Sequence, residues 1–115
     1  MAALSIDVLI DAAIRIQLAE RSISITFAQD SIRIKFPTTR RLAEFLEVPH
    51  YYVLPYFAMM EQEELVTRAE RVGILTTAKG SRKMIDVMKE KYLQETEDLM
   101  GKPVFQEIIK KIPSQ

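Results

Sequence analysis

Apolar positions dominate residues 4–21, and the polar stripe of this segment is narrow. Asp7, Asp11 and Arg15 stand four residues apart, which is the spacing of one face of an α-helix. The pattern predicts a helix over this range, with Arg15 as an ion-pair partner for Asp11. A helix this apolar must be covered on more than one side. We expect the rest of the domain to cover one side and a second subunit to cover the other.

Two segments of alternating apolar and polar residues come next, at positions 22–27 and 31–36. Each places β-branched or aromatic side chains at every second position, which is the period of a β-strand. The apolar positions are Ile23, Ile25 and Phe27, then Ile32, Ile34 and Phe36. We therefore predict two strands joined by a hairpin loop at residues 28–30. Pro37 ends the second strand, and Thr38 or Thr39 is expected to cap the helix that follows.

Residues 38–64 are predicted to form two short amphipathic helices joined by a tight turn near Val48. The apolar positions of the two helices are Leu42, Ala43 and Leu46, then Val53, Phe57 and Met60. This spacing is typical of a helix-turn-helix, which sets the second helix across the first and leaves its outer face exposed. Pro55 is tolerated only in the first turn of a helix, so we expect the second helix to begin near Tyr51 or Tyr52.

A second hairpin is predicted at residues 65–77, directly after the two helices. Residues 65–70 and 73–77 can pair as short strands, with Arg71, Val72 and Gly73 at the tip. Thr77 is a suitable N-cap, so the hairpin is expected to end where a further helix begins.

The remaining residues, 78–112, are predicted to form C-terminal helices. A long helix extends to about residue 100, and its apolar stripe consists of Ile85, Met88, Tyr92 and Leu99. Gly101 is a stop signal and Pro103 is a good first helical residue, so a last helix is expected over residues 104–112. The apolar face of that last helix carries Phe105, Ile108, Ile109 and Ile112.

The composition indicates one folded domain without an overall charge. The chain has 115 residues, of which 48% are hydrophobic and 28% charged, which suits a single domain over residues 1–115. Its 16 basic and 16 acidic residues cancel, so only local charge can argue for nucleic acid. The sequence contains no cysteine, no apolar run long enough to span a bilayer and no signal-peptide pattern. These features favour a cytoplasmic protein.

The order of the predicted elements resembles the winged helix, a helix-turn-helix domain with a β-hairpin wing. Winged-helix regulators of bacteria and archaea commonly carry L-A-x-x-L-x-V-S-x-x-x-V, then an apolar residue with Glu, then G-L-V, and often T-x-x-G after the wing. The matching residues are Leu42, Ala43, Leu46, Val48, Val53, Met60, Glu61, Leu65, Val66, Thr77 and Gly80. Pro49 and Glu64 depart from the pattern. Over roughly residues 31–88, the resemblance implies an α+β winged helix-turn-helix, here with an additional N-terminal strand and extra C-terminal helices.

This resemblance implies a transcription regulator that binds double-stranded DNA through the helix-turn-helix (38–64) and the wing (65–77). Basic residues gather without acids in residues 31–43 and 71–85, and such groups supply affinity through phosphate contacts. The candidate DNA-binding residues are Thr39, Arg40, Arg41, His50, Tyr51, Tyr52, Arg68, Arg71 and Lys79. The competing interpretation of the basic residues is a solvated surface with ordinary ion pairs.

A homodimer is the expected working form. The sequence supplies more apolar surface than one small winged helix needs. This surface comes from the first helix, from the apolar stripe in residues 78–100 and from the last helix, residues 104–112. A dimer that binds two DNA half-sites would also double the contacts of a module that has few base-reading groups.

The outer face of the second helix supports an alternative function. Its outward positions are Leu54, Pro55, Ala58 and Met59, which carry no hydrogen-bond donors for base edges. A surface formed by Tyr52, Leu54, Pro55 and Met59 would more naturally bind protein. The alternative is therefore a winged-helix interaction module within a larger assembly, which the fold by itself does not distinguish from a DNA-binding protein.

Residues with catalytic or metal-binding chemistry are few and scattered. His50 is the only histidine, and the sequence offers neither a second histidine nor a cysteine to complete a metal site. The three glycines, at positions 73, 80 and 101, form no phosphate-binding loop. We therefore expect neither an enzyme nor a bound cofactor or metal.

Overall fold

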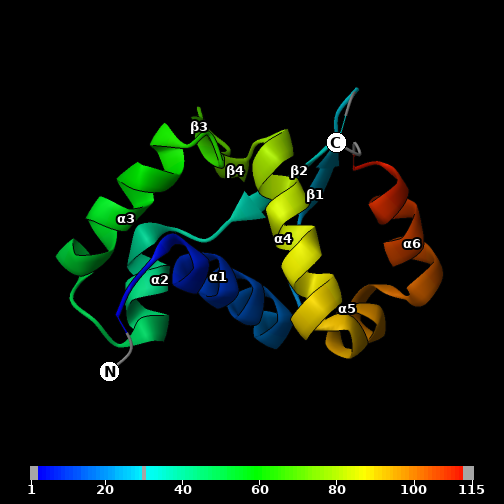
Figure 1. The fold of residues 1–115 in the computed structure, drawn as a ribbon, viewed down its shortest axis with the longest axis horizontal. Helices are drawn as coiled ribbons and strands as arrows, with labels where there is room; N and C mark the ends of the chain where they lie inside the picture. Colours follow the sequence, from blue (N-terminus) through cyan, green and yellow to red (C-terminus); the bar gives the residue numbers. More distant parts are fainter. Residues whose placement is uncertain (1–2, 30, 113–115) are drawn as a thin grey trace.

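The computed structural model describes residues 3–29 and 31–112 and has an α+β architecture (Figure 1). In this part of the chain the helices are α1 (Ile6–Glu20), α2 (Thr39–Leu46), α3 (His50–Gln62), α4 (Ala78–Lys91), α5 (Leu93–Met100) and α6 (Lys102–Lys110). The strands are β1 (Ile25–Phe27), β2 (Ile32–Phe36), β3 (Val66–Ala69) and β4 (Gly73–Thr76). Helix α1 lies across the middle, with α2 and α3 at one end of the molecule and α5 and α6 at the other.

Helix α1 is the centre of the core. It begins at the N-cap Ser5, whose Oγ accepts a hydrogen bond from the Val8 amide at 3.1 Å, and ends at Arg21 in the left-handed region. It contacts α2, α3, α4 and α5 of the same chain, and its apolar side chains from Leu9 to Ile16 are buried. The chain itself therefore covers α1, and this helix does not need the second subunit that its composition suggested.

The four strands form one antiparallel sheet in the order β1-β2-β4-β3. The alternation in β2 is confirmed, since Ile32, Ile34 and Phe36 are buried. The first strand is shorter than predicted and begins at Ile25. Of its predicted apolar positions, Ile23 and Ile25 are partly buried against the core, whereas Phe27 is 63% exposed. This strand is an edge of the sheet with only β2 beside it. Asp30 of the predicted 28–30 loop lies outside the described residues.

Helices α2 and α3, here called the helix pair, confirm the predicted apolar spacing through the buried side chains of Val53, Phe57 and Met60. Thr38 caps α2, and its Oγ1 accepts a hydrogen bond from the Arg41 amide at 3.1 Å. Helix α3 begins at His50, one residue before the expected start near Tyr51 or Tyr52, and Pro55 lies beyond its first turn rather than within it. Pro55 is exposed, so water can reach the helical carbonyl that lacks a partner there.

The β3–β4 hairpin confirms the predicted second hairpin. Its tip is made possible by positive φ angles of 67° at Arg71 and 110° at Gly73. Strand β4 also pairs with β2, so the hairpin is fixed to the strand that precedes the helix pair. This pairing holds the hairpin tip in a fixed position relative to α2.

A buried hydroxyl network joins the sheet to α4. The Ser81 Oγ donates a hydrogen bond to the Ile32 carbonyl at 2.6 Å and lies 2.6 Å from the Thr76 Oγ1. Each hydroxyl has one proton, so Thr76 donates to Ser81 while its own oxygen accepts from the Ile34 amide at 2.8 Å. The adjacent Gly80 is packed so closely that an added Cβ would lie 1.9 Å from the Leu65 carbonyl oxygen.

The prediction of one long helix to residue 100 is wrong. Tyr92 has φ −131° and ψ 31°, which ends α4 and starts α5. The apolar stripe continues in phase across this break, and no glycine or proline marks it, so periodicity could not reveal it. The last helix begins at Lys102, earlier than residue 104, with Pro103 in its first turn and Phe105 and Ile108 buried.

Candidate nucleic-acid interface

The first residues of α2 and α3 meet at one point. Thr39 is the first residue of α2 and His50 is the first residue of α3. The Thr39 Oγ1 and the His50 Nε2 lie 2.7 Å apart, within hydrogen-bond distance. Sequence reasoning nominated both residues separately but missed this contact, which ties the starts of the two helices together.

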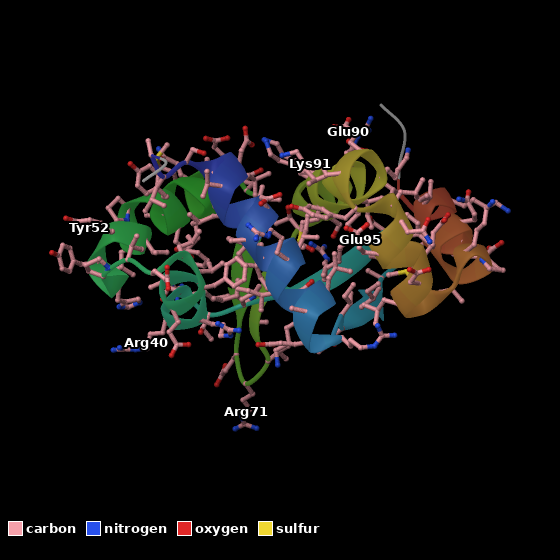
Figure 2. The ribbon with its side chains drawn as sticks, turned by 90° about the horizontal axis from the view of Figure 1, so that it is seen from below. Arg40, Tyr52, Arg71, Glu90, Lys91 and Glu95 are labelled. Carbon is pink, nitrogen blue, oxygen red and sulfur yellow. The ribbon has the colours of Figure 1, made fainter. Side chains whose placement is uncertain are left out.

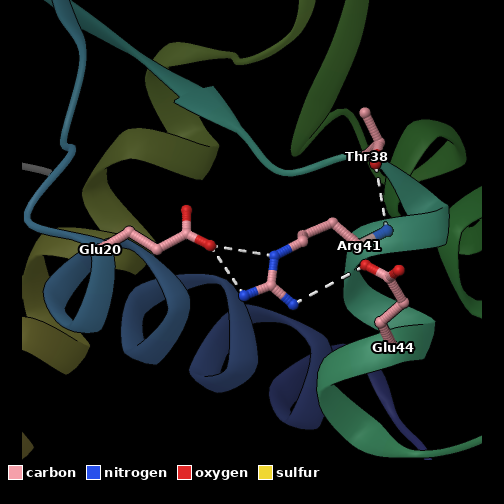
Figure 3. A network of polar contacts seen from close by, with 4 residues as sticks. All are labelled: Glu20, Thr38, Arg41 and Glu44. Atoms are coloured by element: carbon pink, nitrogen blue, oxygen red, sulfur yellow. Dashed lines mark hydrogen bonds and ion pairs between the residues drawn. The ribbon is translucent and has the colours of Figure 1, made fainter.

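Arg40 and Arg41 are neighbours in the sequence but have different surroundings. The Arg41 guanidinium donates to the Glu20 Oε2 from Nε at 3.0 Å and from Nη2 at 2.7 Å, and its Nη1 lies 3.9 Å from Glu44 (Figure 3). Arg40 is exposed and forms no hydrogen bond or ion pair with any residue in the described part of the chain. Arg41 therefore joins α1 to α2, whereas Arg40 keeps all of its donors available.

The tip of the β3–β4 hairpin carries a second available arginine. Arg71 is exposed and, within residues 3–29 and 31–112, has no hydrogen-bond or ion-pair partner. Figure 2 shows Arg71 and Arg40 projecting from the same side of the molecule, one from the hairpin and one from α2. A long anionic backbone laid along this side could contact both.

Another arginine of the β3–β4 hairpin, Arg68, is partly engaged by α3. The Arg68 Nε donates to the Glu61 Oε2 at 3.2 Å, and its guanidinium lies over the Phe57 ring, 5.1 Å from the centroid. The Arg68 side chain is still 63% exposed. Glu61 is therefore held toward the hairpin, which partly neutralises Arg68.

The two basic clusters that lack acids in the sequence gain partners in the fold. Lys83 lies 3.1 Å from Asp7, Arg82 lies 4.0 Å from Asp86, and the Arg33 Nη1 donates to the Thr76 carbonyl at 3.5 Å. The Lys79 ammonium donates to the Glu63 carbonyl at 3.1 Å, at the end of α3. The two acid-free segments therefore do not form acid-free surfaces, because Glu20 approaches the first segment and Asp7 and Asp86 approach the second.

The outward surface of α3 is apolar and aromatic. The exposed fractions are 66% for Tyr51, 47% for Tyr52, 42% for Leu54 and 43% for Met59, and Pro55 is also exposed. The rings of Tyr51 and Tyr52 pack edge to face with centroids 4.8 Å apart. Their phenol hydroxyls are the polar groups that this surface presents near the start of α3.

Among the described residues, no group of three or more histidine, aspartate or glutamate side chains is arranged to hold a metal ion. No helix within residues 3–29 and 31–112 has both the length and the apolarity needed to cross a membrane.

Comparisons with protein-family models, curated proteins and solved structures found no match to this chain.

Proposed function

We propose that this chain is a winged-helix DNA-binding protein that acts as a transcription regulator. Three features support the fold assignment. Helices α2 and α3 pack against each other, a hairpin follows them directly, and β2 pairs with the second strand of that hairpin. In such an arrangement α3 would enter the major groove while the hairpin lies beside it against the backbone.

The pair formed by Arg40 and Arg71 carries the proposal. Both side chains are exposed, neither has a partner among the described residues, and they project on the same side from elements that flank α3. Duplex DNA presents two rows of phosphates on either side of a groove, so two cations from separate elements suit it. Each arginine would hold one phosphate and together they would set the position of α3.

The other candidate residues have supporting functions in this proposal. Thr39 and His50 fix the start of α3, and Arg41 holds α2 against α1 through Glu20. A phosphate contact by Arg41 would have to displace Glu20. The hydroxyls of Tyr51 and Tyr52 are the groups that could approach base edges, so phosphate contacts would supply most of the affinity.

The direct test is fluorescence anisotropy with a labelled duplex of mixed sequence, titrated at low and at near-physiological salt. The proposal predicts micromolar binding at low salt that weakens steeply as salt rises. An absence of binding at low salt would contradict it.

We also propose that the working form is a homodimer. The surface between β1 and α6 supports this, because Phe27 is 63% exposed and Val104 is 51% exposed beside an apolar groove. Replacing an exposed residue of this surface, as in Val104→Asp, should shift the mass measured by light scattering from dimer to monomer. A monomeric wild-type protein would contradict the dimer without affecting the DNA proposal.

A protein-binding module is the second candidate function. The exposed apolar surface of α3, with Tyr52, Leu54, Pro55 and Met59, favours it because groove contacts in DNA need donors and acceptors. Met59→Asp should abolish such a contact. The anisotropy experiment separates the two candidates, since a protein-binding module would not show steep salt-dependent binding to DNA.

A further inference from the structure

Tyr51 and Tyr52, here called the tyrosine pair, expose their side chains in the first turn of α3. The exposed fractions are 66% and 47%, so a large part of both aromatic rings contacts water. The rings pack edge to face with centroids 4.8 Å apart, and each ring therefore limits the movement of the other. Aromatic surface is thus presented to solvent in a defined arrangement at the start of the helix.

This surface suits the face of a nucleobase better than its edge. Base edges are read by hydrogen-bond donors and acceptors, whereas the exposed surface that follows the tyrosine pair along α3 consists of Leu54, Pro55 and Met59. Every base has a π face, and stacking of that face on an aromatic ring needs no hydrogen bond. Within a fully paired duplex the neighbouring base pairs cover both faces of each base, so a ring can stack only on an unpaired or terminal base.

The contact between the starts of α2 and α3 places a cation near the tyrosine pair. The Thr39 Oγ1 and the His50 Nε2 lie 2.7 Å apart. Arg40 directly follows Thr39 in the sequence, and Tyr51 directly follows His50, so both lie next to this contact. Figure 2 shows Arg40 and Tyr52 projecting from the same end of the molecule, one from α2 and the other from α3. A DNA strand carries a phosphate and a base on each sugar, so one strand could contact both elements.

The charges around the tyrosine pair favour an anionic strand on the side of Arg40. Arg40 is exposed and has no hydrogen-bond or ion-pair partner among the described residues. Two exposed acids also belong to α2 and its end. Glu44 lies 3.9 Å from the Arg41 Nη1, and Glu47 is the C-cap, at the opposite end of the helix from Arg40. A phosphate backbone is therefore expected along the first turn of α2 and away from Glu47.

We propose that the tyrosine pair binds an unpaired nucleobase of a DNA strand whose phosphate is held by Arg40. The phosphate contact rests on the proposed function, and the stacking contact specifies the DNA as a duplex that contains an unpaired base. Such a duplex keeps two rows of phosphates for Arg40 and Arg71, while the unpaired base stacks on an exposed tyrosine ring. Stacking supplies a base contact that the apolar outward surface of α3 cannot supply by reading base edges.

The test is fluorescence anisotropy at one low salt concentration with three labelled DNAs of the same sequence. The first is a fully paired duplex, the second carries one unpaired thymine nucleotide, and the third carries an abasic nucleotide at the same unpaired position. We expect the duplex with the unpaired thymine to bind about tenfold more tightly than the other two. The abasic duplex shares the extra phosphate and the flexible backbone, so equal affinities for the thymine and abasic duplexes would overturn the proposal.

Two matched double variants assign the preference to the rings. Tyr51→Leu combined with Tyr52→Leu removes both rings, and the thymine and abasic duplexes should then bind with affinities within about twofold of each other. Tyr51→Phe combined with Tyr52→Phe removes only the hydroxyls and should keep the preference for the unpaired thymine. Loss of the preference in the phenylalanine variant, or its retention in the leucine variant, would overturn the proposal. Both side chains are exposed, and thermal unfolding would verify that the variants are folded.

The fully paired duplex keeps the two proposals separate. Binding of all three DNAs with equal affinity would contradict the tyrosine site, leave the proposed function intact and make a protein the expected partner of this surface. Binding of the thymine duplex without binding of the paired duplex would support the tyrosine site and contradict the proposed function. An absence of binding to all three DNAs would contradict both proposals.

Discussion

The junction of α1, α4 and α5 uses its charged groups differently from the end of the molecule that carries α2 and the β3–β4 hairpin. At the junction, Asp11 accepts a hydrogen bond from the Tyr92 hydroxyl at 2.5 Å and lies 4.0 Å from both Arg15 and Lys91. At the other end, Arg40 and Arg71 have no partner among the described residues. Charges at the junction hold helices together, whereas Arg40 and Arg71 at the other end keep their donors free of the described residues.

The largest loss in the free energy of unfolding is expected from a substitution at the point where the two regions are connected. Helix α4 starts at the base of the hairpin, and Gly80→Ala would place a Cβ 1.9 Å from the Leu65 carbonyl oxygen. We expect the free energy of unfolding to fall by about 3 kcal/mol, because backbone has to move on one side of the contact. Chemical denaturation would measure the loss.

Gly101→Ala is the matched control for that substitution. Gly101 has φ 90° and no atom within 4 Å of an added Cβ, so only backbone strain opposes the change. We expect a cost of about 1–2 kcal/mol. If Gly80→Ala cost no more than this control, the close approach of α4 to Leu65 would not matter for stability.

Tyr92→Phe should weaken the junction and leave the other end intact. The substitution keeps the ring and removes the donor to Asp11, which retains its contacts with Arg15 and Lys91. We expect the free energy of unfolding to fall by about 1–2 kcal/mol, as is typical for a hydrogen bond to a charged acceptor. An unchanged value would mean that the two cations alone satisfy Asp11.

The same substitution should change how stability depends on alkaline pH. Burial, and then the hydrogen bond to Asp11, raise the pKa of Tyr92 from 10.0 to about 12. The folded state therefore keeps the tyrosine proton longer, and this contribution is present below pH 10 and lost as pH rises from about 10 to about 12. Wild type should lose more stability than Tyr92→Phe over that window, and parallel curves would contradict this assignment.

The smallest effects on stability are expected from the adjacent arginines. Arg41→Ala removes exposed ion pairs to Glu20 and Glu44, so we expect a loss below about 1 kcal/mol. Arg40→Ala removes no contact with the described residues and should leave stability unchanged. Thermal unfolding of the two variants compares them directly, and a greater loss for Arg40→Ala would contradict the difference drawn between them.

Local periodicity was enough to predict most of the elements. Every predicted strand and helix has a counterpart, because burial of one face imposes a period of two on a strand and about 3.6 on a helix. The break at Tyr92 could not be predicted, since the apolar period continues through it. The residue at the break makes a tertiary contact with Asp11, which is 81 residues away in the sequence and which no local pattern reveals.

The candidate site was harder to predict, for a physical reason. The composition of a segment shows which charges it carries but not which of them the fold pairs. Arg41 meets Glu20 from α1 and Lys79 meets the Glu63 carbonyl, whereas Arg40 meets no described residue. Contacts between distant segments decide which cations stay available, and local patterns carry no information about them.

The salt dependence of duplex binding tests most directly the proposal that Arg40 and Arg71 form a phosphate-contacting pair. The slope of log affinity against log salt would be measured for wild type and for Arg40→Ala combined with Arg71→Ala. Lys89→Ala combined with Lys102→Ala is the control, since both lysines are exposed and lie on α4 and α6. We predict that the arginine variant lowers the slope by about two and that the lysine variant leaves it unchanged. Equal slopes for wild type and the arginine variant would contradict the account.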